Sequence, residues 1–406
     1  MSSRTKFAVV MTSTCIVALL LLGGVVSKGA AADDTAASNT NVYKHLAVYS
    51  EVLSRIKSEY VEEPDMNNVT LGALNGLLES IDPYASFLNA EQYKEYLKNF
   101  DTYKGDVGLV LAKKFGYVTV ISAVPGSPAA EAGLTTGDML ESIKGIATRD
   151  MPIAFARLLL KGAPGSTIDL SVLRRKPEPQ KLTLTRTAVA IPAVDSKMLP
   201  DNVGYIKVSA MSSSKSREIG TAIENLTKQG AKRLLLDLRY CASGTPEDGI
   251  DVANLFLDKG TITYTQGQKS PKKTFDADAK KDVTALPLVV LVNRGTASGA
   301  EVAAAALDGN KRATLVGERT YGDASILLPI TMDDGSAIIL SVAKYYSPDG
   351  KSIQDNGVTP ETLVADADNS SVDSDDDPDA APAPAAKKPG EDPILQKAIE
   401  VVMKKG

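Results

Sequence analysis

Apolar residues recur at intervals of three and four between residues 41 and 98, as they do on one face of a helix. Two such series occur, Leu46, Val48, Val52, Leu53 and Ile56, followed by Leu71, Leu74, Leu77, Leu78 and Ile81. Asp82-Pro83 should end the second helix, because the residue before a proline is pushed out of the helical region. The pattern predicts a helical N-terminal region.

Between residues 99 and 186 the hydrophobic pattern changes to short β-rich runs that are separated by glycine turns. Tyr117 to Ala123 and Thr167 to Leu173 are typical strands of this block, and Pro152 to Lys161 reads as its helix. A small β-domain with one prominent helix is expected.

Strands and helices alternate from residue 187 to 365. The strands are expected at 203–208, 233–238 and 286–292, and the helices at 217–229 and 300–308. Their nearly continuous apolar character indicates strands that are buried on both faces of a sheet. The chain as a whole is therefore assigned to the mixed α/β class.

Residues 1–32 read as a targeting segment. Arg4 and Lys6 precede the uncharged stretch Phe7 to Val26, and small residues follow at Gly29 to Ala32. A cleaved signal peptide and an N-terminal membrane anchor both fit this pattern, and both imply export.

Acidic residues are concentrated near the C-terminus. Residues 366–392 hold nine acidic residues, two lysines and four prolines, a net charge of -7 within a chain whose net charge is -5. Such a segment buries too little apolar surface to fold, so a disordered linker is expected rather than a functional acidic tail. Helical spacing returns in 393–406, which predicts a short C-terminal helix.

The small numbers of histidine and cysteine residues exclude several kinds of metal site. One histidine, His45, cannot build a multi-histidine metal site, and two cysteines cannot form a cysteine-rich zinc centre. No metal or cofactor is implied. Without a strongly basic balance, no nucleic-acid partner is expected either. His45 lies in the first predicted helix with no nucleophile nearby, so it is interpreted as a surface or packing residue.

The second block resembles a PDZ domain. Its signature is the small-residue string Gly126 to Leu134 followed by Gly137-Asp138. The resemblance implies that Gly105, Val107, Gly108 and Leu109 form a carboxylate-binding loop, and that a partner's C-terminal tail adds to an open sheet edge. A plain β-domain would share the strands but not this string.

Motifs across residues 41–364 together resemble the carboxyl-terminal processing proteases, the PDZ-bearing serine proteases of bacterial envelopes and chloroplasts. Those motifs, besides the PDZ strings, are 82–88, 237–239, 293–301, 316–322, 345–350, 352–354 and 357–360. The resemblance implies a location in the periplasm or cell envelope. It also implies a serine nucleophile, which falls on Ser298, at a strand-to-helix turn where an ordinary helix cap would otherwise be the simpler interpretation.

This sequence departs from the family at the residues that activate the serine. The family's lysine base falls on Asp323, and the glutamine that supports it falls on Leu327. A neutral buried lysine is the expected base in such a dyad, and here it is missing. Asp323 is a weak acceptor unless burial raises its pKa, and recruitment of Lys344 is a further alternative.

The oxyanion region is altered as well. Cys241-Ala242-Ser243-Gly244 stands where the family has Asn-Pro-Gly-Gly, and backbone N–H groups around Gly244 are expected to form the hole. Cys241 is interpreted as buried packing because no histidine is available to activate it.

Two functions follow from these residues. The first is a degenerate protease that binds protein C-termini through its PDZ groove, with a homo-oligomer or an active paralogue as a further partner. The second is an active serine endopeptidase with a rearranged base, and a third alternative is binding unrelated to peptides. The loss of both Lys and Gln favours impaired catalysis.

Overall fold

The computed structural model describes residues 43–99, 104–174, 178–366 and 392–405. The predicted targeting segment and most of the predicted acidic linker lie outside these residues. The chain divides into two compact units between Thr70 and Leu71.

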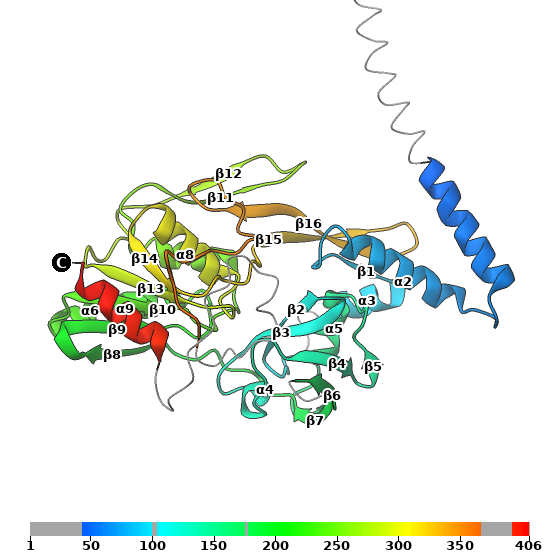
Figure 1. Cartoon of the computed structure of the whole chain (residues 1–406), viewed down its shortest axis with the longest axis horizontal. Coiled ribbons are helices and arrows are strands. Elements are labelled where there is room, and N and C mark those ends of the chain that lie inside the picture. Colours follow the sequence, from blue (N-terminus) through cyan, green and yellow to red (C-terminus); the bar gives the residue numbers. More distant parts are fainter. Residues whose placement is uncertain (1–42, 100–103, 175–177, 367–391, 406) are drawn as a thin grey trace, which may run out of the picture. The chain divides into compact units, whose positions relative to one another are not determined.

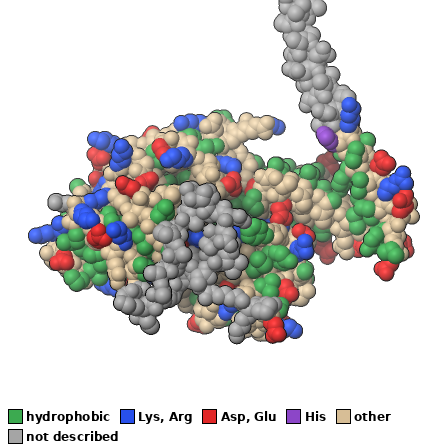
Figure 2. Space-filling model, in the orientation of Figure 1, with side chains coloured by type: hydrophobic (Ala, Val, Ile, Leu, Met, Phe, Trp, Pro, Cys, Tyr) green, Lys and Arg blue, Asp and Glu red, His purple; other side chains and the backbone are tan. Residues whose placement is uncertain are grey.

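The first unit is helical. It contains a helix at residues 43–59 and the start of α2 (Met66–Glu79), as the spacing of apolar residues predicts. His45 is exposed on the first helix and appears as the purple side chain in Figure 2, so its interpretation as a surface residue is confirmed. No helix within the described ranges has both the length and the apolar character needed to cross a membrane.

The second unit contains an antiparallel sheet with the strand order β2-β3-β4-β6-β7, and β5 beside β4 (Figure 1). Its strands are β2 (Leu109–Lys114), β3 (Tyr117–Ala123), β4 (Met139–Ile143), β5 (Ile146–Ala147), β6 (Thr167–Leu173) and β7 (Gln180–Thr185). Two helices, α4 (Pro128–Glu131) and α5 (Ile153–Leu160), complete this PDZ-like part. The strands predicted at 117–123 and 167–173 and the predicted helix at 152–161 are confirmed.

A second sheet has the order β17-β14-β13-β10-β9-β8, in which only β8 is antiparallel to its neighbour. Its strands are β8 (Asp195–Leu199), β9 (Val203–Lys207), β10 (Arg233–Asp237), β13 (Leu288–Val292), β14 (Ala313–Gly317) and β17 (Thr362–Leu363), with the 3-10 turn η1 (Pro200–Asn202) before β9. The helices that accompany this sheet are α6 (Lys215–Lys228), α7 (Pro246–Ala253), α8 (Gly299–Gly309) and α9 (Pro393–Met403). This arrangement confirms the mixed α/β class.

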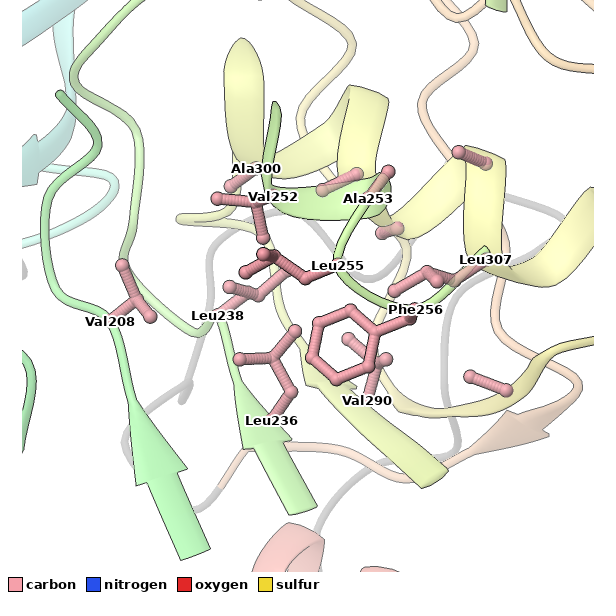
Figure 3. Close-up of a cluster of buried hydrophobic side chains, with 14 of the residues drawn as sticks. Val208, Leu236, Leu238, Val252, Ala253, Leu255, Phe256, Val290, Ala300 and Leu307 are labelled. Carbon is pink, nitrogen blue, oxygen red and sulfur yellow. The ribbon is translucent and has the colours of Figure 1, made fainter. Parts of the chain in front are cut away.

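The two faces of this sheet are both covered. Side chains of β10 alternate, so that Leu234 and Leu236 pack against α6, α7 and α8, whereas Leu235 packs against α9. Figure 3 shows the first of these clusters, in which Leu236 lies beside Phe256 and Val290. Burial on both faces explains why β13 is apolar at every position and why the three central residues of β10 are all leucine.

The third sheet joins distant parts of the chain. Its order is β1-β16-β11-β12, with β15 on the other edge of β16. The strands are β1 (Ser86–Leu88), β11 (Thr261–Gln266), β12 (Lys273–Asp276), β15 (Ser325–Thr331) and β16 (Ala337–Tyr346), and α3 (Ala90–Asn99) follows β1. The 82–88 motif thus contributes a strand, which its helical neighbourhood in the sequence did not predict.

The last helix is held by an ion pair as well as by packing. Asp392 begins α9 and binds Arg239 through two hydrogen bonds of 2.8 Å, and Asp366 accepts a hydrogen bond from the Tyr240 hydroxyl at 2.7 Å. Both aspartates were assigned to the linker, and both are instead bound to the folded core. The linker boundaries therefore move inward by one residue at each end.

Candidate active site

The candidate site lies beyond the carboxyl ends of β10, β13 and β14. Loops after these three parallel strands are joined by backbone hydrogen bonds, from Ala297 N–H to the Cys241 carbonyl at 3.0 Å and from Tyr321 N–H to the Thr296 carbonyl at 2.9 Å. The carboxyl edge of a parallel sheet is the usual place for ligand sites in such folds. It brings Ser298, Gly244 and Asp323 together from segments 25 to 79 residues apart.

Ser298 sits in an uncommon backbone conformation at the N-terminus of α8. Its φ is 55° and its ψ is -124°, a region that residues with a Cβ rarely adopt. Close packing of α8 on α7 accompanies this turn, since a Cβ on Gly249 would lie 1.9 Å from the Gly299 carbonyl oxygen. Strain of this kind is often found at functional residues.

The Ser298 hydroxyl donates to the carbonyl oxygen of Gly244 at 3.0 Å. Gly244 has a φ of +92°, and a Cβ there would lie 2.4 Å from the Met211 Cβ, so glycine is required at this position. The sequence led us to expect the N–H groups around Gly244 to face Ser298. The Gly244 carbonyl, which belongs to the following peptide group, accepts from the serine, and the role of the N–H groups stays a prediction.

Glu301 organises the site and was missed by the sequence analysis. It is fully buried and accepts hydrogen bonds from the N–H of Ser298 at 3.2 Å, of Gly322 at 2.6 Å and of Asp323 at 2.8 Å, and from the Thr320 hydroxyl. Burial raises the pKa of Glu301 to about 8, although these hydrogen bonds oppose the shift. A glutamate three residues after a serine N-cap is the signal of a capping box and could have identified it.

Asp323 occupies the place expected for a base. Burial raises the pKa of its carboxyl group, the nearby Arg157 opposes that shift, and the charges of Asp82 and Asp355 add to it. The expected effect of burial is therefore present. No hydrogen bond among the described residues ends on this carboxylate, and only its backbone N–H is bound.

Leu327 is surrounded by apolar side chains. It packs against a cluster containing Tyr84, Ala242 and Ala297, and against a second one containing Leu88. Leu327 thus forms part of a hydrophobic contact between the motif at 82–88 and the protease-like core.

The other candidate groups are engaged elsewhere. Lys344 is paired with Asp355 at 2.6 Å, and the nearly buried Lys215 is paired with Glu218 at 2.7 Å. Cys241 is fully buried, and burial raises the pKa of its thiol to about 12, which confirms its interpretation as packing. Across the described ranges, no three His, Cys, Asp or Glu side chains are grouped so that they could hold a metal ion.

A cavity of about 530 Å³ opens next to Gly244. Its lining includes Val124 from the PDZ-like part, Ile191 from the connecting segment, and Met211, Ser243 and Thr245 from the core. A mostly apolar cavity adjoining a strained serine is a suitable place for a peptide side chain.

The predicted carboxylate-binding loop lies at the start of β2. Gly105 exchanges two hydrogen bonds with Gly162, Val107 and Gly108 accept from Ala129 and Val124 through their carbonyls, and Leu109 opens the strand. The N–H of Gly108 donates to the Asp106 carboxylate at 2.9 Å. The N–H groups of Gly105 and Gly108 are therefore already used within the chain, and the binding of a carboxylate by this loop stays a prediction.

Comparisons with known proteins agree on both parts of the chain. A family model described as "PDZ domain" matches residues 119–174, and one described as "Peptidase family S41" matches residues 202–364. The carboxy-terminal processing protease CtpA of Bacillus subtilis is 30% identical over 357 residues, which cover 87% of this chain and 76% of the relative. The carboxyl-terminal-processing protease of Synechocystis is 34% identical over 318 residues, or 76% and 74% of the two chains.

A solved structure shares the fold. The photosystem II D1 C-terminal processing protease has a TM-score of 0.65 and 27% sequence identity, and the match covers 79% of this chain and 92% of that one.

Proposed function

Because the chain belongs to the carboxyl-terminal processing protease family, with PDZ and peptidase family S41 parts, we propose that it is an exported member with impaired peptidase activity that binds protein C-termini. The observation that carries this proposal is the side chain at the position of the dyad lysine. Asp323 stands there, beside the carboxylate-bearing Glu301, and Leu327 replaces the partner that would orient a base.

The electrostatics of the site support the impairment. A serine hydroxyl needs a proton acceptor whose pKa lies near the working pH, and loss of general-base activation typically costs about 10²- to 10⁴-fold in rate. Lys344 and Lys215 form ion pairs with Asp355 and Glu218 and not with Ser298. The Ser298 hydroxyl is also turned toward a carbonyl rather than toward a base.

A second candidate is an active endopeptidase in which Asp323 acts as the base. It is favoured by the burial that raises the pKa of Asp323, since a carboxylate of higher pKa is a better proton acceptor. The strained turn at Ser298 also suits a nucleophile.

Cleavage of an unstructured protein such as casein separates the two candidates. The wild-type chain is compared with Ser298→Ala, and the impaired reading predicts turnover that is equal in both. Turnover lost in Ser298→Ala but present in the wild type would support the endopeptidase, and its loss in Asp323→Asn as well would assign the base.

A further inference from the structure

The outer edge of β2 is the place where a peptide strand would be added to the PDZ-like sheet. β2 pairs only with β3, and the two are joined by Phe115 and Gly116, whose φ angles of 52° and 79° indicate a two-residue turn. In such a hairpin Lys114 and Tyr117 form a hydrogen-bonded pair, and the pairs alternate along the ladder. The backbone groups of Leu111 and Lys113 therefore point outward, toward α5.

An arginine already occupies this edge. Arg157, which projects from α5, donates through Nη2 to the carbonyl oxygen of Leu111 at 2.9 Å. An added peptide strand would offer its own backbone N–H to the same carbonyl. Arg157 therefore makes the contact that a ligand would make.

The loop at the other end of the groove is occupied in the same way. The Asp106 carboxylate accepts the N–H of Gly108 at 2.9 Å, in the loop where a C-terminal carboxylate would be bound. The Asp106 carboxylate interacts electrostatically with Arg186, but four of the five N–H donors of Arg186 are already used. Its guanidinium donates to the carbonyls of Leu159, Leu160 and Thr167 and to Ser166.

We propose that the groove is closed by internal mimics of its own ligand, with Asp106 in place of a peptide's terminal carboxylate and Arg157 in place of its backbone N–H. The proposal rests on the proposed binding of protein C-termini and concerns its regulation. A carboxylate-ended tail must displace both side chains, and it also meets the negative charge of Asp106. Asp106 thereby sets how strongly the groove selects a free carboxylate.

Binding of a fluorescent decapeptide that ends in valine tests the charge of Asp106. The apolar residue suits the buried Val107 and Leu111 near the groove. Asp106→Asn keeps an acceptor for Gly108 but removes the charge, and should tighten binding of the free-acid peptide about five- to tenfold while changing its amidated twin less than about twofold. Asp169→Asn, which makes the same charge change on β6, should have no effect. Equal tightening of both peptides would overturn the role of Asp106.

The contact across the groove is tested with the same peptides. Arg157→Met should tighten binding of the free-acid and amidated peptides alike, by about threefold or more, because both supply a backbone N–H to Leu111. Arg149→Met, at an exposed position of the same domain, is the matched control. Unchanged affinities in Arg157→Met, or equal gains in the control, would overturn the role of Arg157.

Hydrogen exchange tests the closure without any ligand. In Asp106→Ala the Gly108 amide loses its acceptor and should exchange about tenfold faster than in the wild type. If no variant binds either peptide, the proposed binding of C-termini fails while this result still decides whether the loop is self-occupied. An unchanged Gly108 exchange rate would refute the closure whatever the peptides do.

Discussion

The backbone N–H of Asp323 donates to the buried carboxylate of Glu301 at 2.8 Å. The same Oε2 atom accepts the N–H of Ser298 at 3.2 Å, so one carboxylate fixes the serine and the residue in the lysine position together. Glu301 therefore links the backbones of Ser298 and Asp323 directly.

The burial of Glu301 predicts a pH-dependent stability. Its pKa is raised from 4.5 to about 8, so the folded state holds this proton more tightly than the unfolded state. Its contribution is present below about pH 4.5 and is lost as pH rises to about 8, with a slope of at most about 1.4 kcal/mol per pH unit. Urea unfolding of the wild type should lose more stability between pH 5 and 8 than Glu301→Gln does. Parallel pH profiles would contradict this.

The strain at Ser298 predicts an order of stability among its variants. Ser298→Ala loses the hydroxyl but keeps a Cβ at a φ of 55°, whereas Ser298→Gly loses both the hydroxyl and the strain. We expect the glycine variant to be the more stable of the two by about 1 kcal/mol in thermal unfolding. A more stable alanine variant would show that the turn is not strained.

Restoring the dyad should restore catalysis. Asp323→Lys with Leu327→Gln is expected to raise casein cleavage by about 10²-fold or more, because a base and its orienting partner are regained. Glutamine at position 327 enters an apolar cluster and should cost about 1–3 kcal/mol of stability. Adding Ser298→Ala should abolish the gain, and a gain that survives that change would have another source.

The ion pair between Arg239 and Asp392 predicts how firmly α9 is docked. Burial favours the neutral form of Asp392, but the hydrogen bonds from Arg239 outweigh it and lower the pKa. The pair therefore stabilises the fold above about pH 4, and this contribution is lost as pH falls through the lowered pKa. Asp392→Asn should cost about 1 kcal/mol at pH 7, because Asp392 is partly exposed to solvent and Arg239 keeps Asp237 as a partner, and hydrogen exchange across α9 should be faster. Glu400→Gln, an exposed pair on the same helix, should cost little.

The thiol of Cys241 should be unreactive in the folded protein. It is fully buried with a pKa raised to about 12, so almost no thiolate is present at pH 7. A thiol reagent should therefore label Cys241 only after the chain unfolds. Labelling should be fast in urea, where the chain is unfolded, and very slow without it. Rapid labelling of the native chain would contradict this, after Cys15 has been changed to serine to remove the other thiol.

Local patterns in the sequence predicted the strands and helices because their side chains repeat with the period of the element that buries them. Tyr117 to Ala123 and Thr167 to Leu173 are strands with the predicted bounds. The position of Ser298 at a turn also followed from a local signal, an apolar strand before a small-residue helix.

Contacts between distant segments could not be predicted in this way. The hydrogen bonds from residues 320–323 to Glu301 form because the loops after β13 and β14 meet at the carboxyl end of the sheet. Gly244 in turn lies so close to Met211 that only glycine fits there. Arg157 and Asp106 read as ordinary charged residues in the sequence. Only the folded chain shows that the Asp106 carboxylate accepts the N–H of Gly108 within the predicted loop and that Arg157 lies on the strand edge.

Asp366 binds Tyr240 and Asp392 binds the neighbouring Arg239, so the two residues that flank the 25-residue stretch 367–391 are attached to adjacent residues of the core. One cut within that stretch would convert α9 into a separate peptide whose retention depends on its affinity for the sheet alone. After such a cut, α9 would be held only by non-covalent contacts, namely the burial of Ile394, Ala398 and Val402 and the ion pair between Asp392 and Arg239. We therefore expect a core that lacks α9 to bind this helix when it is added as a separate peptide.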